Sequence, residues 1–378
     1  MKWGTGVARA TLLLVCLAVL HACARSEPPT ETTLKLPPNE TSALLSVKNP
    51  ALLAAQGWET AFWTVSDEAR AEACLALIGH SKSPPTPDGW EALKVTAQAP
   101  GAAKSDDAEA LCRHGDSIYL VGSHFGKKAG PLQPKRHFLA RFLESAAVAA
   151  GTDVEVELEV VVDAFRLHQA INEALRRSAI PLIACTEAET KAFITETLDE
   201  ARKDKEPWLD RLTPADRPIN IEGAAFLPSG ALLLGLRYPV TAAGHPILVA
   251  IDNVEALFDP AKGEPSVARI WTVDNEGNAA APAGIRAISR IDNTLHVLTG
   301  NLDSDPDRSA ILEAHPEGQK AVSAHYMFPA PSPEAAAIRA DLVRQFPGYQ
   351  DVEGIAFAAD AHVFYVRDRK DEIAVLHE

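Results

Sequence analysis

Acidic and basic side chains come together at the open end of a strongly apolar hairpin in the middle of the sequence. The segment 220–240, NIEGAAFLPSGALLLGLRYPV, carries an apolar run on each side of Pro228-Ser229-Gly230, a turn signal typical of a β-hairpin. With the last two of these residues as the loop, Glu222 lies opposite Arg237 at the far end of the strands. Strands this apolar are buried on both faces, so the two charges must either pair or bind a ligand.

The same unit recurs along the chain, each time as two short apolar runs around a turn. The copies are Glu109 to His124, Glu353 to Arg367, a fourth with Ile285 and Gly300 in place of the acid and the base, and a degenerate first copy that ends at Asp67 and Glu68. Hairpins that repeat at intervals of tens of residues, each followed by further short strands, are typical of a β-propeller.

We therefore predict an all-β fold, a single propeller over residues 39–378. Five blades are counted, or six if two have been merged. Residues 154–162 and 310–314 each supply a blade strand, and residues 32–36 supply the closing strand of the last blade, which is one strand short at the C-terminus.

Helical segments interrupt this pattern. Residues 164–178 and 186–203 have helical periodicity and predict an insertion at about 164–210, between blades two and three. A third helix is expected at 332–345, before the last blade. These segments either cap one end of the ring or are peripheral decoration.

In a propeller the first strand of each blade lines the central channel, so the charged hairpin ends are expected to meet at one rim. In one interpretation these charges pair with one another and lock the inner strands. In the other, surplus acids bind a hard cation such as Ca²⁺, while the Arg and His side chains receive an anionic substrate. The residues concerned are Asp67, Glu68, Glu109, His124, Glu222, Arg237, Glu353 and Arg367.

A basic stretch, residues 122–141, stands out in an otherwise acidic protein. Its Lys127, Lys128 and Arg136 are candidates for binding an anion, because a glycine-containing loop of this charge can hold phosphate or carboxylate. The alternative is a solvated basic loop between strands.

Several of these motifs resemble a known family. Asp351-Val-Glu353-Gly354, the NIEG of residues 220–223, the VGSH of residues 121–124 and the LLGLRYP of residues 233–239 are similar to motifs of a bacterial family of exported propellers known only as a domain of unknown function. More distantly, they resemble the esterase-like phytase propellers, which share the N-x-E-G blade start. The phytase resemblance implies calcium-assisted phosphomonoester chemistry.

The N-terminus predicts export. Lys2 and Arg9 precede the apolar residues 10–20, a run too short to span a bilayer and typical of a secretory signal. Leu20-His21-Ala22-Cys23 resembles a bacterial lipobox, although Ala22-Cys23-Ala24 also fits ordinary signal peptidase. We expect a signal peptide at 1–23, lipidation at Cys23, and a tether and closing strand at 24–38. The protein would then be periplasmic and held to the membrane only through a lipid anchor.

Composition limits the partners. The net charge of −15 excludes nucleic acid, whose phosphates demand clustered Lys and Arg. Neither a Cys/His metal motif nor a GxSxG, HExxH, P-loop or Rossmann fingerprint occurs. Two functions stay open: a monomeric exported module that binds a small anionic ligand or a protein, which is the leading interpretation, and a calcium-assisted phosphoesterase or esterase. Calcium is the only cofactor that either of them suggests.

Lipidation of Cys23 can be tested directly. Metabolic labelling with palmitate should label the wild-type protein in a bacterial host and leave Cys23→Ser unlabelled, because the thiol is the only acylation site in this motif. Equal absence of label from both would leave an ordinary secreted protein.

Overall fold

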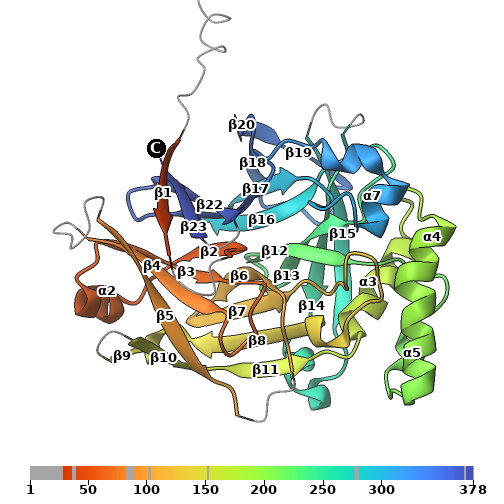
Figure 1. Ribbon diagram of the computed structural model, residues 1–378, viewed down its shortest axis with the longest axis horizontal. Helices are drawn as coiled ribbons and strands as arrows, with labels where there is room; N and C mark the ends of the chain where they lie inside the picture. Colours follow the sequence, from red (N-terminus) through yellow and green to blue (C-terminus); the bar gives the residue numbers. More distant parts are fainter. Residues whose placement is uncertain are drawn as a thin grey trace, which may run out of the picture.

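The structure, a computed structural model, describes residues 29–35, 40–81, 89–100, 104–150, 153–275, 281–369 and 372–377 (Figure 1). Within this part of the chain, twenty-three strands form five sheets, with few helices. The fold is therefore mostly β, as the alternation of apolar runs and turns predicts.

Each sheet starts with a hairpin identified in the sequence. The first sheet consists of β2 (Ala43–Ser46), β3 (Thr60–Val65), β4 (Leu75–His80), β5 (Trp90–Gln98), β10 (Asp153–Glu157) and β9 (Val148–Ala150). The second consists of β6 (Ala108–His114), β7 (Ser117–Gly122), β8 (Phe138–Leu143) and β11 (Glu159–Val162). The third consists of β12 (Asn220–Phe226), β13 (Leu232–Tyr238), β14 (Ile247–Asp252), β15 (Ser266–Asp274) and β19 (Ala337–Arg339).

The two remaining sheets lie in the C-terminal part of the chain. The fourth consists of β16 (Gly284–Ile291), β17 (Thr294–Gly300), β18 (Ala324–Pro329) and β20 (Asp341–Gln345). The fifth consists of β21 (Val352–Phe357), β22 (Val363–Arg369), β23 (Glu372–His377) and the N-terminal β1 (Thr30–Leu34), which pairs antiparallel with β23. The closing strand thus lies two residues before the range expected from the sequence.

The first strands of the five hairpins contact one another in a cycle. β2 packs against β6, β6 against β12, β12 against β16, β16 against β21, and β21 against β2. In the third sheet every residue of β12 and β13 is buried, which explains why this hairpin has no polar face in the sequence. The cycle brings the charged hairpin ends toward one central region.

Two sequence predictions of local structure are wrong. The helix expected at 332–345 is replaced by β19 and β20, and the strand expected at 310–314 is the short helix α7 (Ala310–Ala314). Helix propensity is a weak prior, and here the antiparallel ladder of β20 with β18 outweighs it. For α7, Ser309 supplies the N-cap by accepting a hydrogen bond from the Leu312 amide at 3.2 Å.

The apolar run at 154–162, expected to be one strand, is divided between two sheets. Its first half, β10, pairs parallel with β5, and its second half, β11, pairs antiparallel with β8. At the junction, the amide of buried Leu158 donates to the Gln98 carbonyl at 2.8 Å. The run therefore ties the first sheet to the second.

Helices occur where the sequence predicts an insertion between the second and third sheets. α3 (Arg166–Arg177) is followed by α4 (Glu187–Glu189), a π-helical segment (Thr190–Thr195) and α5 (Glu196–Asp204), and the expected capping box joins Thr186 to Glu189. These helices and α7 gather at one side of the molecule (Figure 1), where α4 contacts α7. The other helices among the described residues are α2 (Pro50–Gln56) and α6 (Glu255–Phe258), with 3-10 turns at Pro134–Arg136, Glu144–Ala146, Leu209–Arg211, Pro260–Lys262 and Pro316–Gln319. None of the helices in the described residues has the length and apolar character needed to cross a bilayer.

The pairing of β1 with β23 yields a stability prediction. Deleting residues 24–38 should lower the melting temperature by roughly 5–10 °C, because it exposes the edge of β23 and removes Glu31, which pairs with Arg367. Deleting only residues 24–28, which precede β1, is the matched control and should change little. Equal melting temperatures for the two truncations, measured by calorimetry, would show that β1 does not stabilise the fifth sheet.

Candidate functional site

The central charges are positioned by a β-bulge that recurs in four hairpins. In each, the pairing register shifts near the open end, and the first-strand residue left without a partner is Glu109, Glu222, Arg286 or Glu353. In the third sheet a second shift also leaves Arg237 of β13 without a partner. A bulge bends the strand and re-aims the extra side chain. The first strands of the second to fifth sheets therefore each present one charged residue out of the regular ladder.

The bulge corrects the register expected for the hairpin at 220–240. Gly223 pairs with Gly235 and Ile221 with Leu236, so Glu222 has no cross-strand partner. Its carboxylate nevertheless contacts the predicted base, with Glu222 Oε1 2.6 Å from Arg237 Nη1. The ion pair is present because the re-aimed Glu222 side chain still reaches Arg237.

A glycine after the bulged glutamate lets the next inner strand approach. A Cβ on Gly223 would lie 2.7 Å from side-chain atoms of Ile285, and one on Gly354 would lie 2.9 Å from the Ala43 backbone. The Glu-Gly pairs in the sequence thus combine a bulged charge with a close contact between sheets. Alanine takes the place of this glycine after Glu109 and after Arg286.

Arg286 is the counterpart of the glutamates in the fourth hairpin, where the sequence pointed to Ile285. Its Nη1 lies 2.8 Å from Glu222 Oε2, and its Nη2 contacts Glu353. All three side chains are almost fully buried, so mutual neutralisation offsets part of their desolvation cost. Glu109, in the second hairpin, has no such arginine in contact among the described ion pairs.

A cavity of about 1180 Å³ opens beside these charges. Its lining includes eleven Asp and Glu side chains but only five Lys and Arg side chains. Nine of the residues expected at the site line it: Asp67, Glu68, Glu109, Lys127, Lys128, Arg136, Glu222, Arg237 and Glu353. The helical insertion contributes Ala188 and Ala192 to the same wall. The cavity is therefore strongly acidic and is covered in part by the insertion.

Three carboxylates form the most crowded part of this lining. Asp67, Asp107 and Glu109 each offer an oxygen within 4.8 Å of the others, and Glu40 and Glu68 lie equally close around Asp67. Burial, reinforced by Asp368 and Asp107, raises the pKa of Asp67 to about 8. Burial also raises the pKa of Asp107 to about 6 and that of Glu109 well above its usual range. A cluster that repels its own charge in this way is suited to a cation.

The surrounding groups orient the cluster. Asp107 has a positive φ of 71°, and its amide donates a hydrogen bond to the Asp67 carbonyl. Its carboxylate accepts a hydrogen bond from the Ser123 hydroxyl and forms an ion pair with Arg136 Nη1 at 2.9 Å. Asn220 is 6% exposed and lines the cavity, and its Oδ1 has no hydrogen-bond partner in the described part of the chain. A free amide oxygen is a ligand that hard cations accept.

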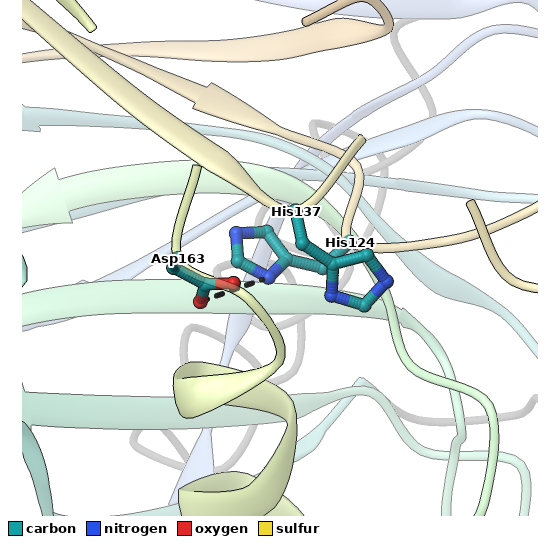
Figure 2. Close-up of side chains that lie close together, drawn as sticks. All are labelled: His124, His137 and Asp163. Carbon is teal, nitrogen blue, oxygen red and sulfur yellow. Dashed lines mark ion pairs between the residues drawn. The ribbon is translucent and has the colours of Figure 1, made fainter. Parts of the chain in front are cut away.

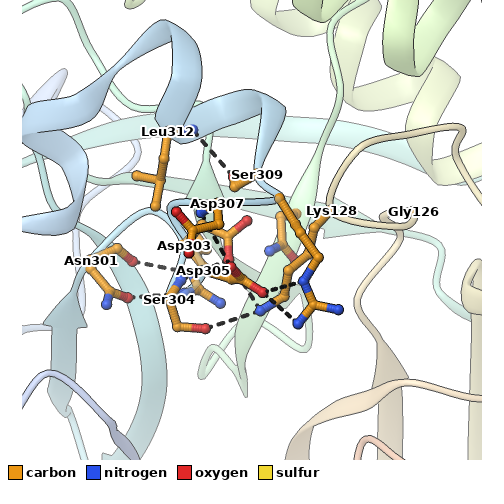
Figure 3. Close-up of polar contacts among 12 residues, drawn as sticks. Gly126, Lys128, Asn301, Asp303, Ser304, Asp305, Asp307, Ser309 and Leu312 are labelled. Carbon is orange, nitrogen blue, oxygen red and sulfur yellow. Dashed lines mark hydrogen bonds and ion pairs between the residues drawn. The ribbon is translucent and has the colours of Figure 1, made fainter.

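The basic side chains expected to bind an anion are partly committed to acids. Arg136 pairs with Asp107, and Lys128 reaches Asp303 at 3.6 Å and the Ser304 hydroxyl at 3.2 Å (Figure 3). Lys127 lines the cavity, is exposed, and has no ion pair with any described residue. Of the three anion candidates, Lys127 is thus the most available.

Two expected site residues lie outside the cavity lining. Arg367 does not pair with Glu353, because the bulge places it opposite Val352, and its guanidinium instead pairs with Asp351 and Glu31. His124 does not meet Glu109, since β7 ends at Gly122 and the chain turns at His124 with a φ of 54°. Its side chain is fully buried near Asp163.

Sequence reasoning missed several residues of the cavity wall and of its surroundings. Arg286 was overlooked because a bulge cannot be read from residue spacing alone. Asp107 was visible two positions before Glu109, in the same relation as Asp351 to Glu353. The run Asp303-Ser304-Asp305-Pro306-Asp307 is a dense acidic signal, and its three aspartates and Ser304 belong to the network of Figure 3. Asp305 forms an ion pair with Arg308.

The raised carboxyl pKa values predict that stability falls as pH rises. Between about pH 4 and pH 8 the folded protein keeps a proton on Asp67 that the unfolded chain releases, so the free energy of unfolding decreases with pH over this window. Asp67→Asn should flatten this slope in chelator-treated protein, whereas Asp204→Asn, at an exposed position of α5, should not. Urea unfolding at several pH values measures the free energy of unfolding. The same pH dependence in wild type and Asp67→Asn would contradict the prediction.

Comparisons with known proteins identify no family. No protein-family model and no curated protein matches the sequence. Among solved structures, the chain is similar to the mannose phosphorylase MPT-4 from Leishmania mexicana in complex with phosphate (8% identity, 98% of this chain and 94% of that chain, TM-score 0.39). It is also similar to the WD40 β-propeller domain of Doa1 (9%, 93% and 97%, TM-score 0.34) and to an exo-1,5-α-L-arabinanase from a bovine ruminal metagenomic library (10%, 89% and 92%, TM-score 0.38). At these identities and TM-scores, no functional property is carried over to this chain.

Proposed function

We propose that the protein is a binding module that holds Ca²⁺ in its central cavity and, through that ion, a small anionic ligand. The observation that carries the proposal is the grouping of Asp67, Asp107 and Glu109, whose carboxylate oxygens lie within 4.8 Å of one another at the cavity wall. Hard cations select oxygen ligands of this kind.

The electrostatics of the cavity favour a cation over any other first ligand. Burial and, to a smaller extent, neighbouring carboxylates raise the pKa of all three carboxyls, and a divalent ion would offset both effects. The unpartnered Oδ1 of Asn220 adds a neutral oxygen to the same wall. Arg286 already balances Glu222 and Glu353, so the uncompensated charge is concentrated on the side of Asp67 and Glu109.

An anionic ligand completes the site. Ca²⁺ takes six to eight oxygen ligands, more than three carboxylates supply when each gives one. A carboxylate or phosphate of the ligand would fill the remaining positions and meet the free ammonium group of Lys127 on the basic loop. This combination reconciles an acidic cavity with the anionic ligand expected from the basic residues.

The architecture supports a central site. We propose that the five sheets are blades of one closed ring, with β1 completing the fifth blade, since the inner strands contact one another in a cycle. Export, lipid attachment at Cys23 and a monomeric state remain part of the proposal and rest on the sequence alone. Residues 1–23 and Cys23 lie outside the described residues.

A calcium-assisted phosphoesterase or esterase is the second candidate. The cavity favours it, because a cation held at the wall of a space of about 1180 Å³ has room beside it for an ester substrate and a water molecule. In that reaction the cation held by Asp67, Asp107 and Glu109 would polarise the ester and lower the pKa of the attacking water. The same residues serve both candidates, so activity assays must decide between them.

Calcium binding is the first test. In chelator-treated protein, Ca²⁺ at about 100 times its Kd should stabilise the fold by roughly 2.7 kcal/mol, and titration calorimetry should detect the binding. Asp67→Asn and Glu109→Gln should melt at the same or a higher temperature without Ca²⁺, because they remove repulsion, and should lose the response to Ca²⁺. Glu200→Gln, at an exposed position of α5, should behave as wild type. Absence of both heat and thermal shift in the wild type would refute the cation site.

The substrate assay separates the two candidates. Calcium-loaded protein is incubated with nitrophenyl phosphate and nitrophenyl acetate, with Asp107→Asn as the matched variant. Ca²⁺ binding without hydrolysis supports the binding module. Hydrolysis that needs Ca²⁺ and is lost in Asp107→Asn supports the enzyme.

A further inference from the structure

A second group of ligand-type side chains lies in the interior, outside the lining of the acidic cavity. His124 follows β7, His137 immediately precedes β8, and Asp163 lies between β11 and α3 (Figure 2). The three residues are at most 1% exposed. His124 Nδ1 lies 3.6 Å from Asp163 Oδ2, and one donor atom from each residue lies within 4.8 Å of the other two.

The imidazoles of this group are buried and poorly hydrogen-bonded. Neither ring nitrogen of His137 has a hydrogen-bond partner among the described residues, and for His124 the backbone of Phe138 is near the ring but no hydrogen bond of regular geometry is formed with a described residue. Leaving buried polar atoms unpaired costs about 1–3 kcal/mol each, and native proteins contain few of them. A neutral imidazole has a proton on one ring nitrogen and a lone pair on the other, so each ring can give one nitrogen to a metal.

Asp163 is held in place as a carboxylate acceptor. Its Oδ1 accepts from the Phe165 amide and its Oδ2 from the Leu167 amide, both at 3.0 Å, at the start of α3. Each oxygen therefore keeps a lone pair, and the two amides fix the orientation of the carboxyl group. A fixed carboxylate beside two neutral imidazoles is a set of three oriented metal ligands.

We propose that His124, His137 and Asp163 bind a divalent transition-metal ion of the Zn²⁺ type. Two imidazole nitrogens and one carboxylate oxygen are a common protein ligand set for Zn²⁺, whereas Ca²⁺ and Mg²⁺ prefer oxygen alone. The ion would give one nitrogen of each ring a partner and would offset the charge of Asp163. This inference does not rest on the proposed calcium site, whose donors are all oxygens.

The neighbouring His168 is not a ligand. Its Nε2 accepts from Asn172 Nδ2 at 3.1 Å, and the Asn172 amide is oriented by its hydrogen bonds to both backbone groups of Arg217. Burial lowers the pKa of His168 to about 4, so the ring is neutral and its single proton is on Nδ1. That nitrogen cannot also give a lone pair to a metal.

The site would have a structural role, since its three side chains are closed to solvent. The ion would join the β7–β8 loop to the first turn of α3 and so fix the helical insertion against the second sheet. The residues on either side of His124, Ser123 and Phe125, line the acidic cavity. The metal would therefore also hold the loop that carries Lys127 and Lys128.

Metal content and stability test the proposal together. The wild-type protein is unfolded in denaturant with chelator and refolded with Zn²⁺ or with chelator alone, because a closed site exchanges metal slowly. Refolding with Zn²⁺ should give one tightly bound equivalent by mass spectrometry of the metal, and a melting temperature several degrees above that of the metal-free protein. Refolding with Co²⁺ should give visible absorption bands of a low-symmetry nitrogen-ligated ion.

Variants distinguish a metal site from three buried side chains that bind no metal. His137→Leu should retain no zinc, and its melting temperature should not respond to Zn²⁺ or chelator, while His114→Gln, on the exposed end of β6, should retain the zinc. Should His137→Leu fail to fold, Asp163→Asn, which keeps an oxygen toward α3, should show Zn²⁺ affinity at least about tenfold lower. Asp67→Asn should keep the zinc, which distinguishes the two sites. Wild-type protein that refolds without binding Zn²⁺ or Co²⁺ would overturn the proposal.

Discussion

The structure depends on one repeated constraint, a β-bulge that takes a charged residue out of an otherwise apolar inner strand. On the first strands of the hairpins three of the bulged residues are acids, Glu109, Glu222 and Glu353, and one is a base, Arg286. Arg286 contacts Glu222 and Glu353, and Arg237 of β13 contacts Glu222 as well. Buried charges persist only when they are paired or bind a ligand, so Glu109, which has no arginine in contact among the described ion pairs, determines what the centre can do.

The third acid has to be accommodated differently. Glu109 faces Asp67 and Asp107 rather than an arginine, because the first hairpin has no bulge and ends in acidic residues. The centre therefore has a neutralised half around Arg286 and an acidic half around Asp67. A cation bound in the acidic half would have the same effect there as Arg286 has in the other half, which is to offset repulsion between carboxylates.

Sequence patterns predicted the hairpins and their charged ends, because apolar runs and turn residues are local signals. They predicted the Glu222–Arg237 pair with the wrong register, since a β-bulge is an irregularity of backbone pairing that residue spacing does not show. The same limit explains β20, where pairing with β18 overrides helix propensity. His124 was assigned to the rim because its left-handed turn cannot be seen in a strand pattern.

That turn connects the two proposed sites. Ser123 hydrogen-bonds Asp107 on the cavity side, while the next residue, His124, lies beside Asp163 in the interior. A positive φ is uncommon for a residue other than glycine and costs free energy, so the surrounding contacts must hold it. Under the two proposals, a metal on His124 would supply that restraint and would orient Ser123 and the basic loop before the cavity binds its cation. Ordering a loop in advance lowers the entropic cost of binding, so the nitrogen-rich site would strengthen the oxygen-rich one without touching its ligand.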